Sequence, residues 1–188
     1  MSKRKIKPFR PVYPSPAALI TSADAEGKAN IITLGECFNV SIAKPVILGI
    51  AVCKARYSYE LIRQLGEFVV NLPTAAILRK VDAVGCVSGR ECDKFERFGL
   101  TPLPASAVRP PLIAECPVNV ECRLLGEQDV GDHQLFFGEA VAQHVDEDVL
   151  KPDGSIDVER LDMLVYACGC YLSAGKKLGT HGFTRGKP

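Results

Sequence analysis

VNVECRLLGEQDVGDHQLFFGEAVAQHV, residues 118–145, is the stretch that decides the fold. Residues 118–124 alternate apolar and polar side chains with a period of two, the pattern of a strand with one buried face. Residues 126–132 are rich in turn formers, and residues 134–145 again favour a strand. The stretch therefore predicts a long antiparallel hairpin.

Four shorter runs elsewhere in the chain also predict strands. Residues 17–21 and 30–35 flank the short polar turn 24–28, which contains a glycine, and this pattern indicates a hairpin. Residues 46–53 are almost continuously apolar, as expected for a strand that is buried on both faces, and residues 68–72 show the same character. The chain is therefore rich in short strands.

Predicted helices are fewer and short. Ser58 is placed to cap a helix over residues 59–65, and Thr74 to cap a second over residues 74–83. Residues 93–98 predict a helical turn, and residues 157–164 a fourth helix. Strands and helices do not alternate regularly, so we expect a mainly β, antiparallel barrel with the helices outside it. A length of 188 residues fits a single domain over residues 1–188.

Composition and charge exclude several classes of protein. The chain has 23 Lys and Arg against 22 Asp and Glu and no Trp, so it lacks the basic, aromatic surface of a nucleic-acid-binding protein. No stretch approaches the roughly 18 apolar residues of a membrane span, and no signal-peptide core follows the basic N-terminus. We therefore expect a cytoplasmic protein with neither nucleic acid nor membrane as a partner.

The eight cysteines are expected to be free thiols, because the chain shows no export signal. No two CxxC pairs occur and the three histidines are not clustered, so no metal site is predicted. A thiol-based or metal-binding regulator is still a third hypothesis, because Cys37 follows a predicted strand and could be exposed. GxSxG, Walker and GxGxxG patterns are missing, which argues against the commonest hydrolase and nucleotide sites.

The most suggestive site sequence is Cys53-Lys54-Ala55-Arg56-Tyr57-Ser58, where a buried strand ends and a helix begins. A helix start offers unpaired N–H groups and a positive dipole end, which favour an anion. Lys54 and Arg56 add positive charge, and Arg can hold a phosphate through two parallel hydrogen bonds. A capped helix beside two solvated bases is the alternative interpretation.

A second candidate is Ser88-Gly89-Arg90-Glu91-Cys92-Asp93-Lys94-Phe95. The Ser-Gly pair permits close backbone approach, and Arg90 and Lys94 could face a phosphate or a ribityl chain. The alternative interpretation is an exposed loop of mixed charge.

In their order and spacing, these motifs make the chain resemble the flavin reductase-like FMN-binding split-barrel proteins. The similarity is greatest to the branch that contains flavoredoxin and the archaeal-type ferric reductase. It covers nearly the whole chain and is carried by residues 16–21, Gly27, 30–33, Pro45, 56–58, 68–73, Gly85, 88–89, 93–95, 99–101, 131–133, 171–172 and 177–179.

The resemblance implies an antiparallel split β-barrel that forms a homodimer with FMN bound near the subunit interface. The isoalloxazine ring would lie along Thr33, Leu34, Gly35, Glu36 and Cys37. The ribityl chain and phosphate would lie near Ala51, Cys53, Lys54, Arg56 and Ser58, with Arg56 and Ser58 on the phosphate. Ser88, Gly89 and Lys94 would close the site. His133 would lie near the flavin or nicotinamide as a catalytic candidate, or else be a turn histidine bonded to nearby backbone.

Two positions depart from the family pattern. Many members carry small or hydroxyl residues after the position of Thr33, where this chain has Leu34-Gly35-Glu36-Cys37, and many carry two prolines where it has Lys44-Pro45. The first departure changes the contacts that would tune the flavin ring.

The function that the resemblance implies is electron transfer. The protein would pass electrons from NADH or NADPH through FMN to flavin, ferric iron or a similar acceptor, with the flavin carrying the chemistry and no general acid or base required. The alternative is a flavoredoxin-like carrier with no NAD(P)H turnover of its own, which receives electrons from a redox protein partner.

Overall fold

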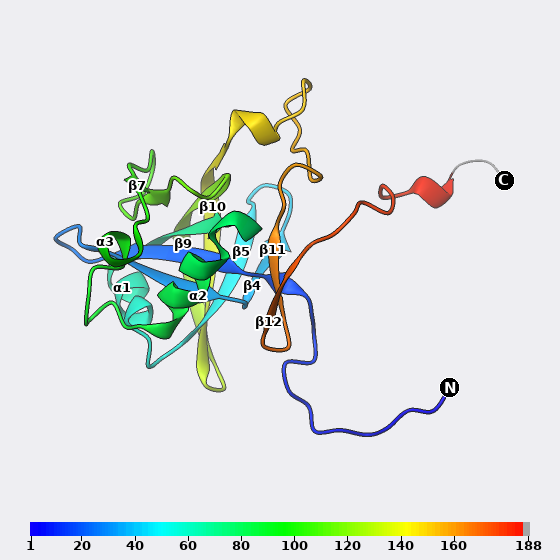
Figure 1. Cartoon of the computed structure of the whole chain (residues 1–188). Helices are drawn as coiled ribbons and strands as arrows, with labels where there is room; N and C mark the ends of the chain where they lie inside the picture. Colours follow the sequence, from blue (N-terminus) through cyan, green and yellow to red (C-terminus); the bar gives the residue numbers. More distant parts are fainter. Residues whose placement is uncertain (186–188) are drawn as a thin grey trace.

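The computed structural model describes residues 1–185 and is built round a seven-stranded antiparallel sheet (Figure 1). Its strand order is β3-β2-β6-β9-β10-β5-β4. The strands are β2 (Ala18–Ala23), β3 (Ala29–Leu34), β4 (Cys37–Ser41), β5 (Ile47–Cys53), β6 (Glu67–Leu72), β9 (Val118–Val130) and β10 (His133–Val145).

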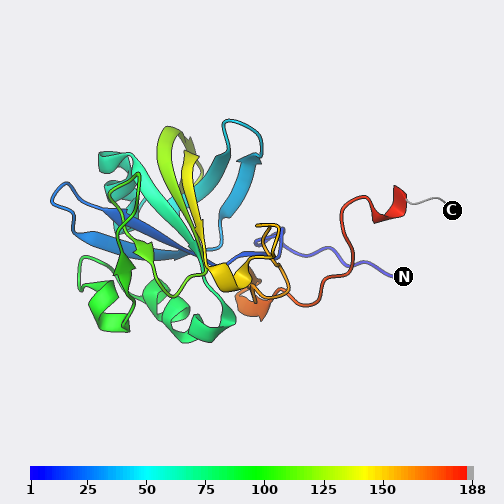
Figure 2. The same ribbon diagram turned by 90° about the horizontal axis from the view of Figure 1, so that it is seen from above.

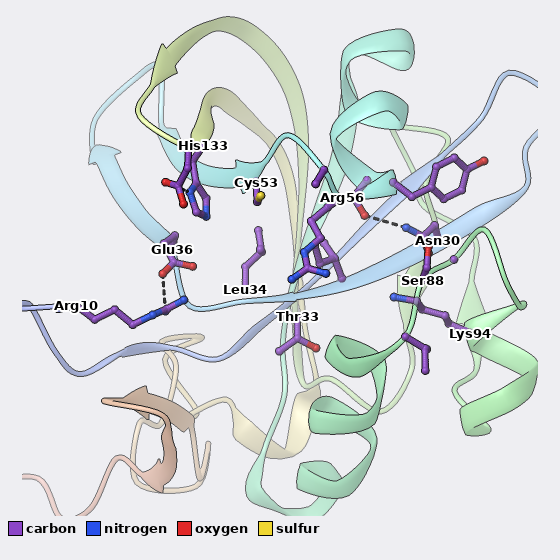
Figure 3. Close-up of a pocket in the computed structure, with 17 residues that line it drawn as sticks. Arg10, Asn30, Thr33, Leu34, Glu36, Cys53, Arg56, Ser88, Lys94 and His133 are labelled. Atoms are coloured by element: carbon purple, nitrogen blue, oxygen red, sulfur yellow. Dashed lines mark hydrogen bonds and ion pairs between the residues drawn. The ribbon is translucent and has the colours of Figure 1, made fainter.

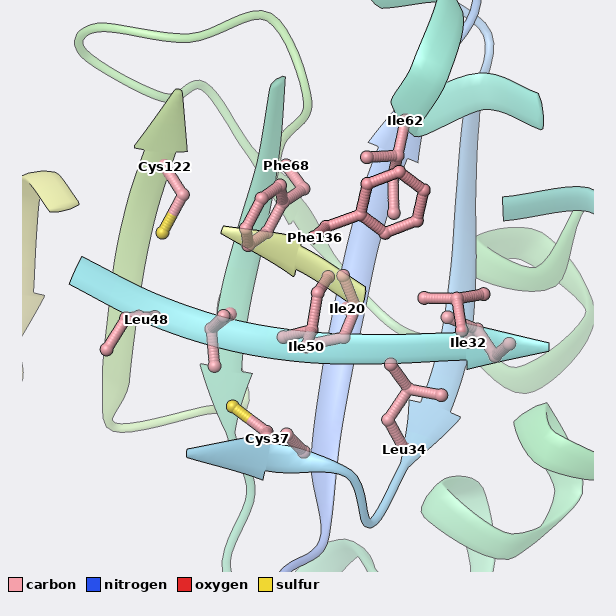
Figure 4. Packing of buried hydrophobic residues seen from close by; sticks show 13 residues of the cluster. Ile20, Ile32, Leu34, Cys37, Leu48, Ile50, Ile62, Phe68, Cys122 and Phe136 are labelled. Carbon is pink, nitrogen blue, oxygen red and sulfur yellow. The ribbon is translucent and has the colours of Figure 1, made fainter. Parts of the chain in front are cut away.

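The strand order explains why this sheet is a split barrel. β3 and β4 are its two edges, yet only Gly35 and Glu36 separate them in the chain. The sheet must therefore curl until its edges meet at this bend, beside Leu34 and Cys37 (Figure 4). β3 and β4 do not pair with each other, so the barrel is open along these two edges, and this is the split.

The hairpin predicted from residues 118–145 is present as β9 and β10, and it supplies the curvature. Its register shifts between Phe137 and Gly138 and again between Ala140 and Ala142. Such bulges bend a strand and increase its twist. At Gly138 a Cβ would lie 2.5 Å from the Phe68 ring and 3.0 Å from the Cβ of Cys122, so only glycine fits at this bend.

The barrel interior is filled by apolar side chains from every part of the sheet (Figure 4). Ile20, Ile50, Phe68 and Phe136 are fully buried there. Alternation along β2 sends the neighbouring Leu19 to the opposite face, where it packs under the helices with Val81 and other residues of a second cluster. The sheet is thus covered on both sides.

Helices and small sheets surround this core. The helices are α1 (Tyr57–Leu65), α2 (Leu78–Cys86) and α3 (Lys94–Phe98), with 3₁₀ turns η1 (Ala75–Ile77), η2 (Glu147–Val149) and η3 (Phe183–Arg185). The remaining strands are β1 (Ser15–Pro16), β11 (Leu164–Ala167) and β12 (Cys170–Ser173) in one sheet, and β7 (Pro102–Leu103) with β8 (Leu112–Ile113) in another. The two terminal segments run away from the barrel (Figures 1 and 2).

The structure confirms the mainly β, antiparallel fold but corrects two predicted helices. Residues 157–164 form a turn rather than a helix: Arg160 N–H donates to the Asp157 carbonyl, Asp162 has a φ of 39°, and Leu164 begins β11. The helix predicted over residues 74–83 starts as η1 and continues as α2, which ends at Cys86. Strands β1, β4, β7, β8, β11 and β12 were not predicted.

Candidate functional site

The main cavity lies in the split of the barrel and has a volume of about 370 Å³ (Figure 3). Its walls come from β3, the end of β5, the start of α1, the loop 87–89 and the tip of the β9–β10 hairpin. This volume falls in the range of about 300–1,000 Å³ that small-molecule sites occupy.

One end of the main cavity is built to hold an anion. Arg56 is the extended N-cap residue of α1, and its side chain extends from the start of the helix into the cavity (Figure 3). Within residues 1–185 no carboxylate or other acceptor pairs with this guanidinium, whereas the Arg90 guanidinium is held by Glu60 at 2.6 Å. A positive charge without a partner at a helix start favours a negatively charged ligand.

Ser58 does not cap α1 as predicted, because it lies inside the first turn. Its buried hydroxyl instead accepts a hydrogen bond from Asn30 Nδ2 at 2.8 Å. The Oδ1 atom of the same Asn30 is buried with no hydrogen-bond partner in the described chain. A buried acceptor without a donor is costly, and a ligand hydroxyl would satisfy it.

Gly89 leaves room for that asparagine. A Cβ at position 89 would lie 1.9 Å from Asn30 Oδ1, closer than any real contact, so a side chain there would force the amide to move. Glycine at this position therefore keeps open the wall of the cavity that Ser88 and Gly89 form.

Lys94 is a buried lysine in the wall of the cavity, placed by the cap of α3. The Asp93 carboxylate accepts hydrogen bonds from the N–H groups of Phe95 and Glu96 and so fixes the helix start. Lys94 Nζ donates to the carbonyls of Ile31 and Val84 at 2.7 and 2.8 Å. Burial lowers the pKa of Lys94 to about 8. An ammonium has three donors, so one is left for a ligand.

The other end of the main cavity carries one ion pair and one histidine–carboxylate hydrogen bond. Arg10 Nη1 and Glu36 Oε1 are 2.6 Å apart, and His133 Nδ1 lies 2.7 Å from Asp132 Oδ1. The hydrogen bond from His133 lowers the pKa of the Asp132 carboxyl. His133 stands opposite Cys53 in the β5–β10 ladder, so both reach this end. The bonding partner of His133 is thus a carboxylate and not the nearby backbone.

The structure brings most of the predicted site residues to the main cavity. Those that line it are Thr33, Leu34, Glu36, Cys53, Arg56, Ser58, Ser88, Gly89, Lys94 and His133. The Thr33 hydroxyl is already used, because it donates to the Val81 carbonyl at 2.6 Å. Lys54 is placed elsewhere, in an ion pair with Asp129 at 2.5 Å, so the predicted anion site loses that charge.

Gly35, Cys37 and Ala51 line an adjoining hollow instead of the main cavity. Cys37 is buried in the core at the start of β4, and burial raises the pKa of its thiol to about 12. A thiol in this state is a poor nucleophile, so the burial of Cys37 argues against the third hypothesis, a thiol-based regulator that uses this residue.

Sequence reasoning missed several lining residues, among them Arg10, Asn30 and Asp132. Asn30 was detectable as an amide at the start of an apolar run. Arg10 had no sequence signal, because its place depends on how the N-terminal segment crosses the β3–β4 bend.

The described residues contain no group of three or more His, Cys, Asp or Glu side chains that could hold a metal ion. No helix between residues 1 and 185 is long and apolar enough to span a membrane.

Fold and cavity together define a small antiparallel split-barrel protein with a ligand cavity in the split. Residues 10–174 match the sequence model of the flavin reductase like domain, and the chain belongs to that family, as the resemblance predicted. An uncharacterized protein of Archaeoglobus fulgidus is 35% identical over 177 residues, which cover 94% of each chain.

Two solved structures of similar sequence share the fold. Flavoredoxin of Desulfovibrio vulgaris (Miyazaki F) is 30% identical and superposes with a TM-score of 0.90, covering 99% of this chain and all of its own. Flavoredoxin from Methanosarcina acetivorans is 31% identical, with a TM-score of 0.84 over 97% of this chain and all of its own. The fold assignment therefore extends over almost the entire chain.

Proposed function

We propose that this protein binds FMN in the main cavity and is an oxidoreductase that passes electrons from NADH or NADPH to flavin, ferric iron or a similar acceptor. Membership of the flavin reductase-like family and the similarity to two flavoredoxins support a flavin as the ligand. We also propose that residues 1–188 act as one domain in the cytoplasm.

The observation that carries the proposal is the anion site at the start of α1. Arg56 offers an unpartnered guanidinium, Lys94 a buried ammonium and Ser58 a hydroxyl, all in the wall of one end of the main cavity (Figure 3). This donor set fits a phosphate. The orphaned Asn30 Oδ1 beside it fits a hydroxyl of a sugar-alcohol chain, so the residues suit both polar parts of FMN.

This polarity would direct the flat ring toward the other end of the cavity. Leu34 and Cys53 would pack on it there, and Glu36 and His133 would border it. Bound flavin supplies a reversible hydride acceptor. Asp132 holds the His133 imidazole in place, so His133 is our candidate for a hydrogen bond to the ring or to the nicotinamide.

We further propose a homodimer. Exposed apolar side chains gather on β4 and just beyond it and on the two terminal segments, where Val40, Ile42, Phe9 and Leu178 are between 46% and 98% exposed. A second copy of the chain would cover them. Light scattering coupled to size-exclusion chromatography tests this, and a monomer at micromolar concentration would refute it.

An absorption spectrum tests the central proposal. The purified protein, reconstituted with FMN, is expected to be yellow and to bind about one FMN per chain, and NADH or NADPH should bleach it without oxygen. A colourless protein that takes up no added FMN would refute the proposal.

The similarity to flavoredoxins favours one alternative, an electron carrier that holds FMN but does not react with nicotinamide nucleotides. Its electrons would come from a redox protein partner. Steady-state assays with NADH and with NADPH separate the two functions, since the carrier stays yellow under both while dithionite bleaches it.

A further inference from the structure

A second hollow adjoins the main cavity, and the proposed function does not use it. This side hollow has a volume of about 480 Å³ and lies between residues 10–16 of the N-terminal segment, the β3–β4 bend and the sheet of β11 and β12. Pro11, Pro14, Phe38 and Tyr166 form much of its wall. Its surface is mainly apolar, unlike that of the main cavity.

The two cavities share one boundary. Arg10 and Glu36 line both of them, and their ion pair of 2.6 Å lies at this boundary. The Arg10 guanidinium also lies 5.5 Å from the centre of the Tyr166 ring. Since the ring end of the main cavity carries Glu36, a molecule in the side hollow would lie next to the bound flavin ring.

The charge of the side hollow limits what it can bind. Among the described residues that line it, Arg10 and Glu36 are the only charged ones, and they neutralise each other. The hollow therefore offers no free cation to a phosphate group, in contrast to the Arg56 end of the main cavity. Proline and aromatic side chains instead favour a flat apolar ring.

We propose that the side hollow is the subsite of the electron acceptor, and that this acceptor is a flat, uncharged, conjugated dicarbonyl compound of the quinone class. The inference rests on the proposed function, because it needs reduced flavin as the electron donor. A hydride, which carries two electrons and one proton, leaves the reduced flavin for the quinone. A second proton comes from water, so the quinone becomes a hydroquinone and the flavin is oxidised.

Binding of 1,4-naphthoquinone to the oxidised, FMN-loaded protein tests the subsite without turnover. Phe38 lines the side hollow only and is half-exposed on β4, the strand that we propose a second copy partly covers. The binding is therefore measured only after light scattering shows that the variant keeps the oligomeric state of the parent protein. We expect Phe38→Ala to weaken naphthoquinone binding about fivefold to tenfold in calorimetry, the usual worth of an aromatic contact. Leu125→Ala, which removes an exposed side chain on β9 that lines neither cavity, is the control and should change nothing.

The ion pair at this boundary gives a second, independent test. Glu36→Gln removes the partner of Arg10 and leaves its positive charge free at the mouth of the side hollow. The variant should bind 1,4-naphthoquinone-2-sulfonate more tightly relative to neutral 1,4-naphthoquinone, with a change of about fivefold or more in the ratio of the two dissociation constants. The ratio is independent of any general loss of stability.

Three outcomes overturn the subsite while FMN binding stands: equal naphthoquinone affinity in Phe38→Ala and the parent protein, an unchanged affinity ratio in Glu36→Gln, or competition between naphthoquinone and FMN. Competition would place the quinone in the main cavity. A chain that takes up no FMN refutes the proposed function and with it the subsite, so the two failures are distinguishable.

Discussion

Removing the Arg56 side chain is the sharpest perturbation of the proposed phosphate site. The guanidinium has no partner within the described chain, so Arg56→Ala leaves no buried group unsatisfied and should change the free energy of unfolding by less than about 0.5 kcal/mol. A hydrogen bond to a charged group contributes about 1.5–3 kcal/mol. The dissociation constant for FMN should therefore rise roughly 10-fold to 150-fold.

Flavin fluorescence titration at low salt measures this loss, since salt screens an exposed charge. Riboflavin, which lacks the phosphate, is the matched ligand, and its affinity should not change in Arg56→Ala. Arg90→Ala is the matched protein control: it removes the same charge from a neighbouring arginine that pairs with Glu60 and lies over the Tyr57 ring. Equal losses for FMN and riboflavin, or an unchanged FMN affinity, would refute the placement of the phosphate.

Three further predictions concern Lys94, Gly89 and Glu121. The pKa of Lys94 is about 8 in the protein without ligand, and a bound anion raises this pKa, so the affinity for FMN should fall above pH 8 by at most roughly tenfold per pH unit. Lys94→Met should abolish this pH dependence. An affinity of the parent protein that does not change with pH would contradict a contact between Lys94 and the phosphate. Gly89→Ala should displace the Asn30 side chain and weaken FMN binding, whereas Gly126→Ala, where a Cβ meets nothing within 4 Å, should not. Equal FMN affinities of the two variants would show that the cavity wall accommodates a Cβ at position 89. Burial alone would raise the pKa of Glu121, but hydrogen bonds from Ser106 and His144 hold it at about 2, so its stabilisation is full above pH 4.5 and is lost toward pH 2. Glu121→Gln should therefore lower the free energy of unfolding, measured with urea, by about 2–3 kcal/mol at pH 7 and by progressively less below pH 4.5. An equal loss at pH 7 and near pH 2 would refute the stabilising role of the Glu121 carboxylate.

The barrel strands could be predicted because their patterns are local. Residues 118–145 showed the hairpin through period-two alternation and a turn, and residues 46–53 showed a buried strand through continuous apolarity. The prediction of a helix over residues 157–164 was wrong for a physical reason. Val158, Leu161 and Leu164 have helical spacing, but the Asp157 carboxylate accepts a hydrogen bond from Glu159 N–H and closes a turn instead. Short-range spacing does not distinguish these two structures.

For the site, sequence predicted the residue types near each strand end but not which charges were free. Lys54 and Arg56 looked equivalent in sequence, yet Lys54 forms an ion pair with Asp129 of β9, a residue that is far from it in the sequence. Cys37 looked accessible because it follows a strand, but the next strand begins with it and buries it. Both errors come from contacts between residues far apart in the chain, which no local pattern contains.

The face of the sheet to which the His133 side chain points depends on the number of β10 residues between it and Gly138. Side chains along β10 alternate between the two faces of the sheet without interruption from Gly138 to His133, because the extra residue of the nearby bulge, Leu125, lies on β9. Deleting one residue between the two would turn the imidazole away from Cys53 and out of the split, whereas deleting two would shorten the arm but keep its direction. Relatives that keep this histidine in place should therefore vary in length here only by even numbers.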